Sequence, residues 1–515
     1  MISQYGSESG GVPRVMFVTV FLALGLAVSL WLRWRHQHRG LLKAAQQFPG
    51  PKTLPGLGNA MMFMCKPEEM VKQIKNLFVN YGDIVRFWLG PDLNIVVACP
   101  DELKVLLTNS KMSVKGPQYK YMADLIGRGL LSGSGPEWSK HRKIAKPNFG
   151  KRAIESYTPV FNDEVSLLLE ELRRKPHDQQ FNIYRDIVNT TSYSVCRTLM
   201  GLTKEQTMNI PGLQEIIEES PSNYKVIFDR MTKWYLQIDP VFWLTSQYRL
   251  QKRFSKLITI FGKDIVKHRR EHLKNITEDF KLEHMEMEED GMLSVVDRFI
   301  LSGELDQPTM EKEIFTVFTA SQESTAKTAS YLLLMMAYHP DCQEKLYNEI
   351  KTIVGDSDRD VTDDDLKKMP YLEMAFKEIV RLFPIGAILQ RTVAEDIAIR
   401  SGYLPAGSSM IVSIFHLHRD PRFWDNPDAF DPERFNPENT ERRHQNAYIP
   451  FSLGPMDCLG RYFGIKLVKT ICVSILREFE VTSQSSYEDL RLAIYISVVA
   501  IDGYPVLLKK RNSTK

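Results

Sequence analysis

An uncharged apolar run near the amino terminus constrains this chain more than any other feature. Residues 15–32 read VMFVTVFLALGLAVSLWL. As a helix, this run would be roughly 27 Å long, about the thickness of the hydrocarbon core of a bilayer. A cleaved signal peptide is the alternative, but its apolar core would be shorter, and no small-residue cleavage site precedes the basic residues that follow. The run therefore predicts a single transmembrane helix.

The charged residues beside this run predict its orientation. Arginine is frequent directly after the run and occurs once just before it. By the positive-inside rule, the bulk of the chain then faces the cytosol. The chain is accordingly divided into a lumenal tail (1–14), an anchor (15–32), a basic and Pro/Gly-rich hinge (33–59) and a single large domain (60–515). Within the hinge, the Pro/Gly run favours a stiff extended connector, although an ordinary linker has the same composition.

Composition excludes several classes of protein. Lys plus Arg (66) nearly balances Asp plus Glu (63), so no nucleic-acid partner is expected. The 6 cysteines form no CxxC pair and are too few for a disulfide scaffold. His268 and His272 are four residues apart, but without an HExxH motif they indicate a charged helix face and not a zinc site.

Helical periodicity dominates the chain after the hinge, with short β-rich runs near both ends. One hairpin is predicted from runs 84–89 and 95–98, and a second from runs 494–501 and 504–508 around Asp502-Gly503. The acidic stretch 286–290 has no apolar face and predicts a solvated loop. The fold class is therefore mainly α with small β-sheets (α+β).

The longest predicted helix runs from near Asp306 to His339. Its second half contains the apolar stretch YLLLMMA and should pass through the interior. Glu323, Ser324 and Thr325 lie in its middle, and a buried carboxylate or hydroxyl is costly without partners. Either the helix surfaces there, or these groups line a cavity and deliver protons.

A second predicted helix spans residues 370–382 and places Glu378 and Arg381 on one face. Taken alone, such a pair is commonly a surface ion pair worth a few tenths of a kcal/mol. The stretch 414–439 is dense in proline and aromatic residues and predicts an ordered, irregular meander.

Cys458 lies in the Gly/Pro-bounded loop YIPFSLGPMDCLG, just ahead of a helical run that begins at Arg461. The amino end of a helix and nearby backbone amides favour a thiolate. An isolated cysteine is more often inert than functional, so the loop alone leaves both interpretations open.

In their order along the chain, these motifs resemble a microsomal cytochrome P-450, a haem-thiolate monooxygenase. Each motif is weak alone, but together they cover essentially the whole chain and imply the cytochrome P-450 fold after a single transmembrane helix. The stretch ERRHQNAYIPFSLGP resembles the animal family-four-like clan. The motifs are the anchor with its proline hinge, WSKHR (138–142), ASQEST (320–325), ExxR (378–381), FDPERF (430–435) and the cysteine loop.

The resemblance assigns roles to residues of this chain. Cys458 would be the axial thiolate ligand of a haem b iron. The acid–alcohol relay that delivers protons to the oxygen site would be Glu323, Ser324 and Thr325. Haem contacts would come from Trp138, Arg142, Arg391, Phe451 and Gly460, and a buried structural ion network from Glu378, Arg381 and Arg434.

The chain departs from the family pattern at three positions. Met456 replaces the usual arginine two residues before the ligand, and Asp457 adds an acid beside it. The relay position holds Ser324 in place of threonine, which loses the β-branch that fixes a rotamer. Ser321 replaces the usual glycine, and Ala320 stands where a haem-esterifying variant has glutamate, so no covalent haem link is expected.

The resemblance implies an endoplasmic-reticulum membrane enzyme that inserts one oxygen atom from O2 into an apolar fatty acid, sterol or xenobiotic. Electrons would come from an NADPH-cytochrome reductase, with cytochrome b5 as a second partner. Two alternatives stay open: a degenerate haem- or lipid-binding member without turnover, and a peroxide isomerase that needs no reductase.

Overall fold

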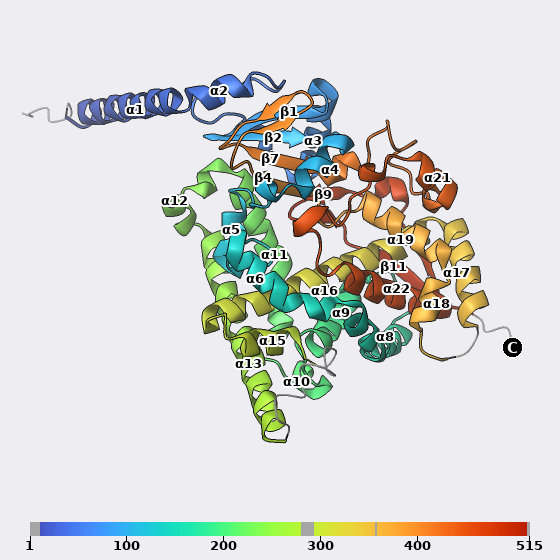
Figure 1. Ribbon diagram of the computed structural model, residues 1–515. Coiled ribbons are helices and arrows are strands. Elements are labelled where there is room, and N and C mark those ends of the chain that lie inside the picture. The colour runs from blue at the N-terminus through green and yellow to red at the C-terminus, as the bar shows by residue number, and fades with distance from the viewer. Residues whose placement is uncertain (1–10, 280–292, 356–357, 512–515) are drawn as a thin grey trace, which may run out of the picture.

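Helices dominate the computed structural model of this chain, which describes residues 11–279, 293–355 and 358–511. The predicted class, mainly helical with small sheets, is confirmed (Figure 1). The predicted acidic loop at 286–290 and most of the predicted lumenal tail lie outside the described residues. The α-helices are α1 Gly11–Gln37, α2 Arg39–Ala45, α3 Pro67–Tyr81, α4 Pro100–Thr108, α5 Tyr119–Ile126, α6 Gly135–Ala145, α7 Lys151–Ser156, α8 Thr158–Arg173, α9 Tyr184–Thr198, α10 Lys204–Met208, α11 Leu213–Thr232, α12 Asp239–Trp243, α13 Ser246–Asp279, α15 Val295–Ser302, α16 Gln307–Tyr338, α17 Pro340–Val354, α18 Asp363–Lys367, α19 Pro370–Leu382, α20 Ile414–Leu417, α21 Pro437–Arg442 and α22 Arg461–Glu478.

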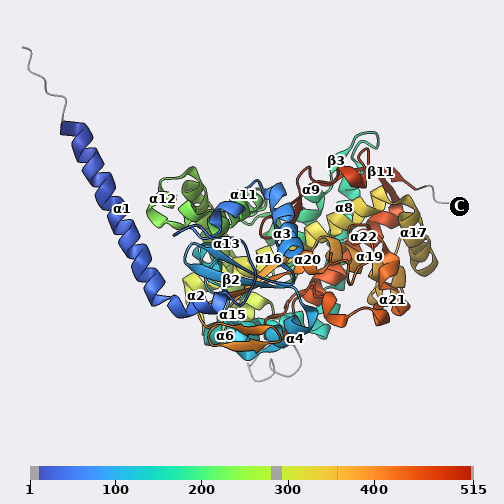
Figure 2. The same ribbon diagram turned by 90° about the horizontal axis from the view of Figure 1, so that it is seen from above.

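The apolar run forms helix α1, which projects away from the body of the molecule (Figure 2). Within the described part of the chain, it is the one helix long and apolar enough to cross a membrane. Helix α1 extends beyond the predicted anchor, through the basic residues to Gln37, and α2 follows almost at once. These residues are compatible with a helix, and the first proline after the run is Pro49.

The Pro/Gly segment after α2 packs against strand β1 (Ile84–Leu89). Phe48 is buried. A Cβ on Gly50 would lie 2.1 Å from the Arg86 carbonyl oxygen, and one on Gly58 would lie 2.6 Å from the Trp88 carbonyl oxygen. Such close backbone approaches need glycine. The segment is therefore docked on the sheet and is not a free linker.

Within residues 11–279, 293–355 and 358–511, four small sheets accompany the helices, and the largest has the strand order β1-β2-β7-β4. Strands β1 and β2 form the first predicted hairpin, although β2 already begins at Asp92. The strands are β1 Ile84–Leu89, β2 Asp92–Val97, β3 Phe181–Asn182, β4 Ile388–Thr392, β5 Ile397–Ile399, β6 Gly402–Leu404, β7 Ser409–Ser413, β8 Phe479–Thr482, β9 Leu492–Ile494, β10 Val498–Ala500 and β11 Pro505–Lys510.

The second predicted hairpin is wrong. Strand β10 pairs with β9, and β11 pairs with β3 and β8 in another sheet. The chain reverses earlier than predicted, where the Tyr495 N–H donates to the Ser497 carbonyl oxygen over 3.0 Å. The Asp502-Gly503 turn then directs the chain to the other sheet, and the Asp502 carboxylate is held by Arg491.

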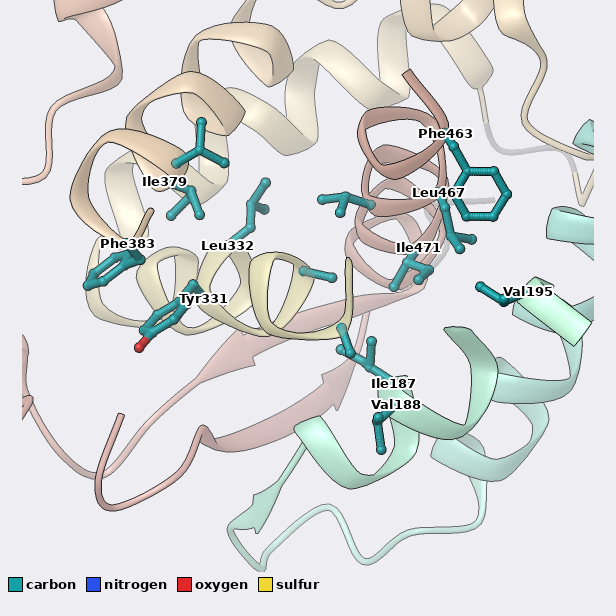
Figure 3. Packing of buried hydrophobic residues seen from close by; sticks show 14 of the residues in the cluster. Ile187, Val188, Val195, Tyr331, Leu332, Ile379, Phe383, Phe463, Leu467 and Ile471 are labelled. Carbon is teal, nitrogen blue, oxygen red and sulfur yellow. The ribbon is translucent and has the colours of Figure 1, made fainter. Parts of the chain in front are cut away.

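Helix α16 forms the centre of the core, and its limits match the predicted helix. The Asp306 side chain caps it by accepting from the Thr309 N–H over 2.9 Å. Its apolar second half is buried against α9, α19 and α22, as Figure 3 shows in part. There the Tyr331 ring stacks on the Phe383 ring with 4.0 Å between centroids. The polar middle of α16 is thus carried on a helix that is packed on several sides.

The remaining predicted elements near the carboxyl end also agree with the structure. Helix α19 spans the predicted residues 370–382, and α22 begins at Arg461. The stretch 414–439 is largely irregular and contains only short helical turns. Helix α22 lies directly after the cysteine loop and packs on α16.

Candidate active site

A cavity of about 410 Å³ lies between helix α16, helix α6, strand β4 and the cysteine loop. Side chains of these elements that are distant in sequence converge on it, and most of its walls are apolar. The structure brings nine of the predicted site residues to this cavity: Trp138, Arg142, Glu323, Ser324, Thr325, Arg391, Phe451, Cys458 and Gly460.

The cysteine loop is held by its backbone. The Cys458 N–H donates to the Phe451 carbonyl oxygen over 2.9 Å. Gly454 has a positive φ of 76°, and a Cβ there would lie 2.2 Å from the Leu107 carbonyl oxygen, so this turn requires glycine. The loop therefore presents one sulfur atom in a defined position just ahead of helix α22.

The Cys458 side chain is exposed to the cavity, although protein surrounds it. Burial raises its pKa, and a hydrogen bond from the Gly460 backbone opposes that shift. Asp457 raises the pKa further. A metal ligand must be the thiolate, so a cation in the cavity would have to supply the stabilisation that the protein alone does not.

Among the cationic side chains that line the cavity, Lys115, Arg142 and Arg391 lie close together as one cluster. Burial, together with charge repulsion from Arg391 and Arg142, lowers the pKa of Lys115 to about 7. Among the residues that the structure describes, neither Lys115 nor the buried Arg391 has a carboxylate partner. Such a cluster is suited to an anionic group in the cavity.

The position of the usual arginine is filled by Met456, which is buried and lines the cavity. The neighbouring Asp457 is half exposed and accepts from Arg142 over 2.5 Å. Arg142 also lies 5.6 Å from the Trp138 ring centre. Sequence reasoning missed Lys115, because it belongs to none of the motifs and strand pairing alone brings it beside Arg391.

The acid and the alcohols of the predicted relay do not bond to one another. Glu323 contacts the ammonium group of Lys327, one helical turn away. Ser324 and Thr325 each donate to the carbonyl oxygen four residues earlier over 2.6 Å. Sequence reasoning also missed Lys327, although the spacing of an acid and a lysine four residues apart on a buried helix is visible in the sequence.

Glu378, Arg381 and Arg434 lie outside the cavity, between α19 and the meander. Glu378 and Arg381 are fully buried and form two hydrogen bonds of 2.6 and 2.7 Å. Arg381 also donates to three carbonyl oxygens of residues 418–429. Arg434 lies at the edge, with 3.4 Å between its Nε and Glu378 Oε1.

The donor set fits a haem with a thiolate ligand. The sulfur of Cys458 is open to a mainly apolar cavity, and two cations without acidic partners among the described residues lie at the same cavity, as the two carboxylates of a haem require. An all-protein metal site does not explain this arrangement, since the described residues contain no group of three His, Cys, Asp or Glu that could hold an ion.

Comparison with known proteins agrees with this fit. The family model "Cytochrome P450" matches residues 48–494. The chain is 28% identical to Cytochrome P450 4c3 of Drosophila melanogaster, over 99% of this chain and 97% of that protein. It is 28% identical to human Cytochrome P450 4V2, over 90% and 89% of the two chains, and 30% identical to mouse Cytochrome P450 4V2, over 95% and 93%. The chain therefore belongs to the cytochrome P450 family of haem-thiolate monooxygenases, and its relatives are animal family-4 members.

Proposed function

We propose that this chain is a membrane-anchored monooxygenase that inserts one oxygen atom from O2 into an apolar substrate. The observation that carries the proposal is the opening of Cys458 into a mainly apolar cavity beneath the polar middle of helix α16. Fatty acids, sterols and foreign lipophilic compounds all match such walls, because apolar surface binds by leaving water.

Cys458 would hold the haem iron, and Arg142, Lys115, Arg391 and Trp138 would hold the haem carboxylates. Haem b, when bound, supplies the oxygen-activating chemistry. Lys115 would supply the positive charge that the family's usual arginine, replaced here by Met456, would provide. Phe451 and Gly460 would lie beside the cofactor, as their position on the cavity wall supports.

The chain itself would orient the substrate, exclude water and move protons. Glu323 is the acid of the relay, and the hydroxyls of Ser324 and Thr325 face the same cavity. The two hydroxyls donate to backbone carbonyls, so they can accept a further hydrogen bond from water or substrate. Proton transfer from Glu323 would first require its contact with Lys327 to loosen.

The buried network of Glu378, Arg381 and Arg434 would fix the meander against α19. Ionic networks of this kind specify an arrangement more than they stabilise it. We assign residues 60–515 to one catalytic domain, which the lack of a Gly/Ser-rich linker supports.

Helix α1 would anchor the enzyme in the endoplasmic-reticulum membrane with the catalytic domain in the cytosol. The arginines after the apolar run support this orientation. An NADPH-cytochrome reductase on the same side of the membrane would supply electrons, with cytochrome b5 as a second donor.

The carbon-monoxide difference spectrum of the reduced full-length protein tests the proposal. We expect a thiolate-type Soret band that Cys458→Ser removes while the protein stays folded. Reconstitution with reductase and NADPH should then convert a lipophilic probe, lauric acid or cholesterol, to a product with one added oxygen. Folded wild-type protein without the thiolate band would refute the proposal.

Two other outcomes identify the alternatives. A thiolate band without NADPH-dependent product would indicate a haem- or lipid-binding member. Rearrangement of a lipid peroxide without reductase would indicate an isomerase. The contact of Glu323 with Lys327 is the observation that favours testing both, because neither activity needs a free relay acid.

A further inference from the structure

A lysine lies on the buried helix α16 where the cavity wall is otherwise mainly apolar. The Lys327 side chain is 8% exposed and contacts Glu323, which is 13% exposed. The Lys327 ammonium group also donates to Ser497 Oγ over 2.7 Å. Ser497 precedes strand β10, so the far end of the sequence contributes to this wall.

Two more polar side chains complete the cluster. The Tyr224 hydroxyl hydrogen-bonds the Thr319 hydroxyl and lies beside the Glu323 carboxylate. Tyr224 comes from helix α11 and Thr319 from α16, and both line the cavity with the other members. We name Tyr224, Thr319, Glu323, Lys327 and Ser497 the polar wall.

The polar wall has spare hydrogen-bonding capacity. An ammonium group has three N–H donors, and Lys327 has acceptors for two of them in the described part of the chain. A carboxylate has about four acceptor positions, of which the contacts with Lys327 and Tyr224 use two. A group in the cavity can therefore both accept from Lys327 and donate to Glu323.

The charge of the polar wall decides which group fits best. Lys327 is already balanced by Glu323, so a ligand carboxylate gains little attraction and meets a like charge. A purely apolar ligand would leave a buried donor without an acceptor, which is costly. A hydroxyl group can donate one hydrogen bond and accept another at the same time, and it adds no charge.

We propose that the polar wall recognises the hydroxyl group of an uncharged lipid and discriminates against a free carboxylate. The proposal rests on the proposed function in one respect, namely that this cavity receives the substrate. It narrows the substrate class to neutral lipids with a hydroxyl group, such as sterols and fatty alcohols.

The test measures binding to the full-length holoenzyme by equilibrium dialysis at neutral pH, with decan-1-ol, decanoate and undecane as probes. Decan-1-ol and undecane have the same number of heavy atoms and differ in the hydroxyl group. We expect wild-type protein to bind decan-1-ol about tenfold more tightly than undecane, the effect of one hydrogen bond to a charged group.

Two variants separate charge from hydroxyl recognition. Glu323→Gln leaves Lys327 as an unpaired cation, so decanoate should gain about tenfold relative to decan-1-ol. The double variant Glu323→Gln/Lys327→Met removes both charges, keeps the wall neutral, and should lose the preference for decan-1-ol over undecane. Unchanged ratios among the three probes in both variants would overturn the proposal.

The carbon-monoxide difference spectrum of each variant serves as the control for folding and haem content. If Glu323→Gln does not fold, the double variant still tests hydroxyl recognition, because it leaves no unpaired charge. A wild-type thiolate band with no preference among the probes refutes this inference and leaves the proposed function standing. A preference among the probes in folded wild-type protein that lacks the band refutes the proposed function alone.

Discussion

Two acid–base pairs on buried helices of this protein are satisfied to different degrees. Glu378 and Arg381 on α19 are both fully buried, and the Arg381 guanidinium group bonds to the carboxylate and to three backbone carbonyls. Glu323 and Lys327 on α16 face a cavity and have hydrogen-bond donors and acceptors that are not used. We call Glu378 and Arg381 the saturated pair, because it can exist in one arrangement only. We call Glu323 and Lys327 the unsaturated pair, because it can still bind a ligand.

The chemistry of the two cations explains the difference. The guanidinium group of arginine is a planar fork with five donors, which suits several fixed acceptors at once. The lysine ammonium group is a compact charge on a flexible stem and tolerates a change of partner. The saturated pair therefore specifies the shape of the meander, and the unsaturated pair is available for function.

The largest expected change in the free energy of unfolding comes from breaking the saturated pair, Glu378 and Arg381. Arg381→Met leaves Glu378 as an uncompensated buried charge, so we expect the free energy of unfolding to fall by about 3–5 kcal/mol. Thermal melting and the yield of the carbon-monoxide band report this loss. Arg381→Lys keeps the charge but not the fork and should recover only part of it. A melting temperature near that of wild type would contradict the comparison.

Loss of the unsaturated pair should cost less. Lys327→Met leaves Glu323 at a cavity wall where water can solvate it, so we expect a loss of about 1–3 kcal/mol in the free energy of unfolding. Denaturant titration measures it. The double variant Glu323→Gln/Lys327→Met should regain most of the loss. A loss as large as that of Arg381→Met would mean that the two pairs do not differ.

A third charged site, the cluster of Lys115, Arg142 and Arg391, has more cations than carboxylate partners and extends the comparison. The pKa of Lys115 is lowered to about 7 without haem, and haem carboxylates would raise it again. Haem binding would then return a proton to Lys115, besides releasing the proton that Cys458 loses when it becomes the ligand. The Lys115 contribution makes haem affinity fall as the pH rises above about 7, so the ratio of the haem transfer rates at pH 9 and pH 6 should be several-fold larger in wild type than in Lys115→Arg.

Matched variants decide the cause of this pH dependence. Lys115→Arg stays charged throughout and should remove it, whereas Lys115→Met should lose haem quickly at both pH values. The same pH dependence in all three proteins would assign it to another group.

The smallest effect is expected at the edge of the saturated pair. Arg434 is 3.4 Å from Glu378 and its guanidinium group donates chiefly to two meander carbonyls. Arg434→Met should lower the free energy of unfolding by about 1 kcal/mol, measured by denaturant titration. A loss close to that expected for Arg381→Met would show that Arg434 belongs to the saturated pair as well, against what its hydrogen bonds indicate.

Local signals predicted most of the fold. The Asp306 cap and the prolines that begin helices α17 and α19 are features of neighbouring residues, so these boundaries were predictable. The pairing of β11 was not, because its partners lie elsewhere in the sequence and a turn signal says nothing about them. The apolar pattern does not predict where α1 ends, because the basic residues that follow it are also compatible with a helix.

The candidate site was predictable where one motif carries the chemistry. Cys458 and Glu323 stand in recognisable local patterns. Lys115 and Ser497 reach the cavity only through strand pairing and chain reversal, so no local pattern reports them. Lys327 could have been found, since its spacing from Glu323 places the two on one face of a helix whose burial was predicted.

The docking of residues 48–59 on strand β1 has a mechanical consequence. Gly50 and Gly58 allow two stretches of backbone to lie in contact, and a side chain at either position would push them apart. Because this segment follows α2 and α1 in the chain, its close fit on β1 would fix the direction in which helix α1 leaves the body of the molecule. Substitutions at these glycines would therefore alter the orientation of helix α1 relative to the body of the molecule.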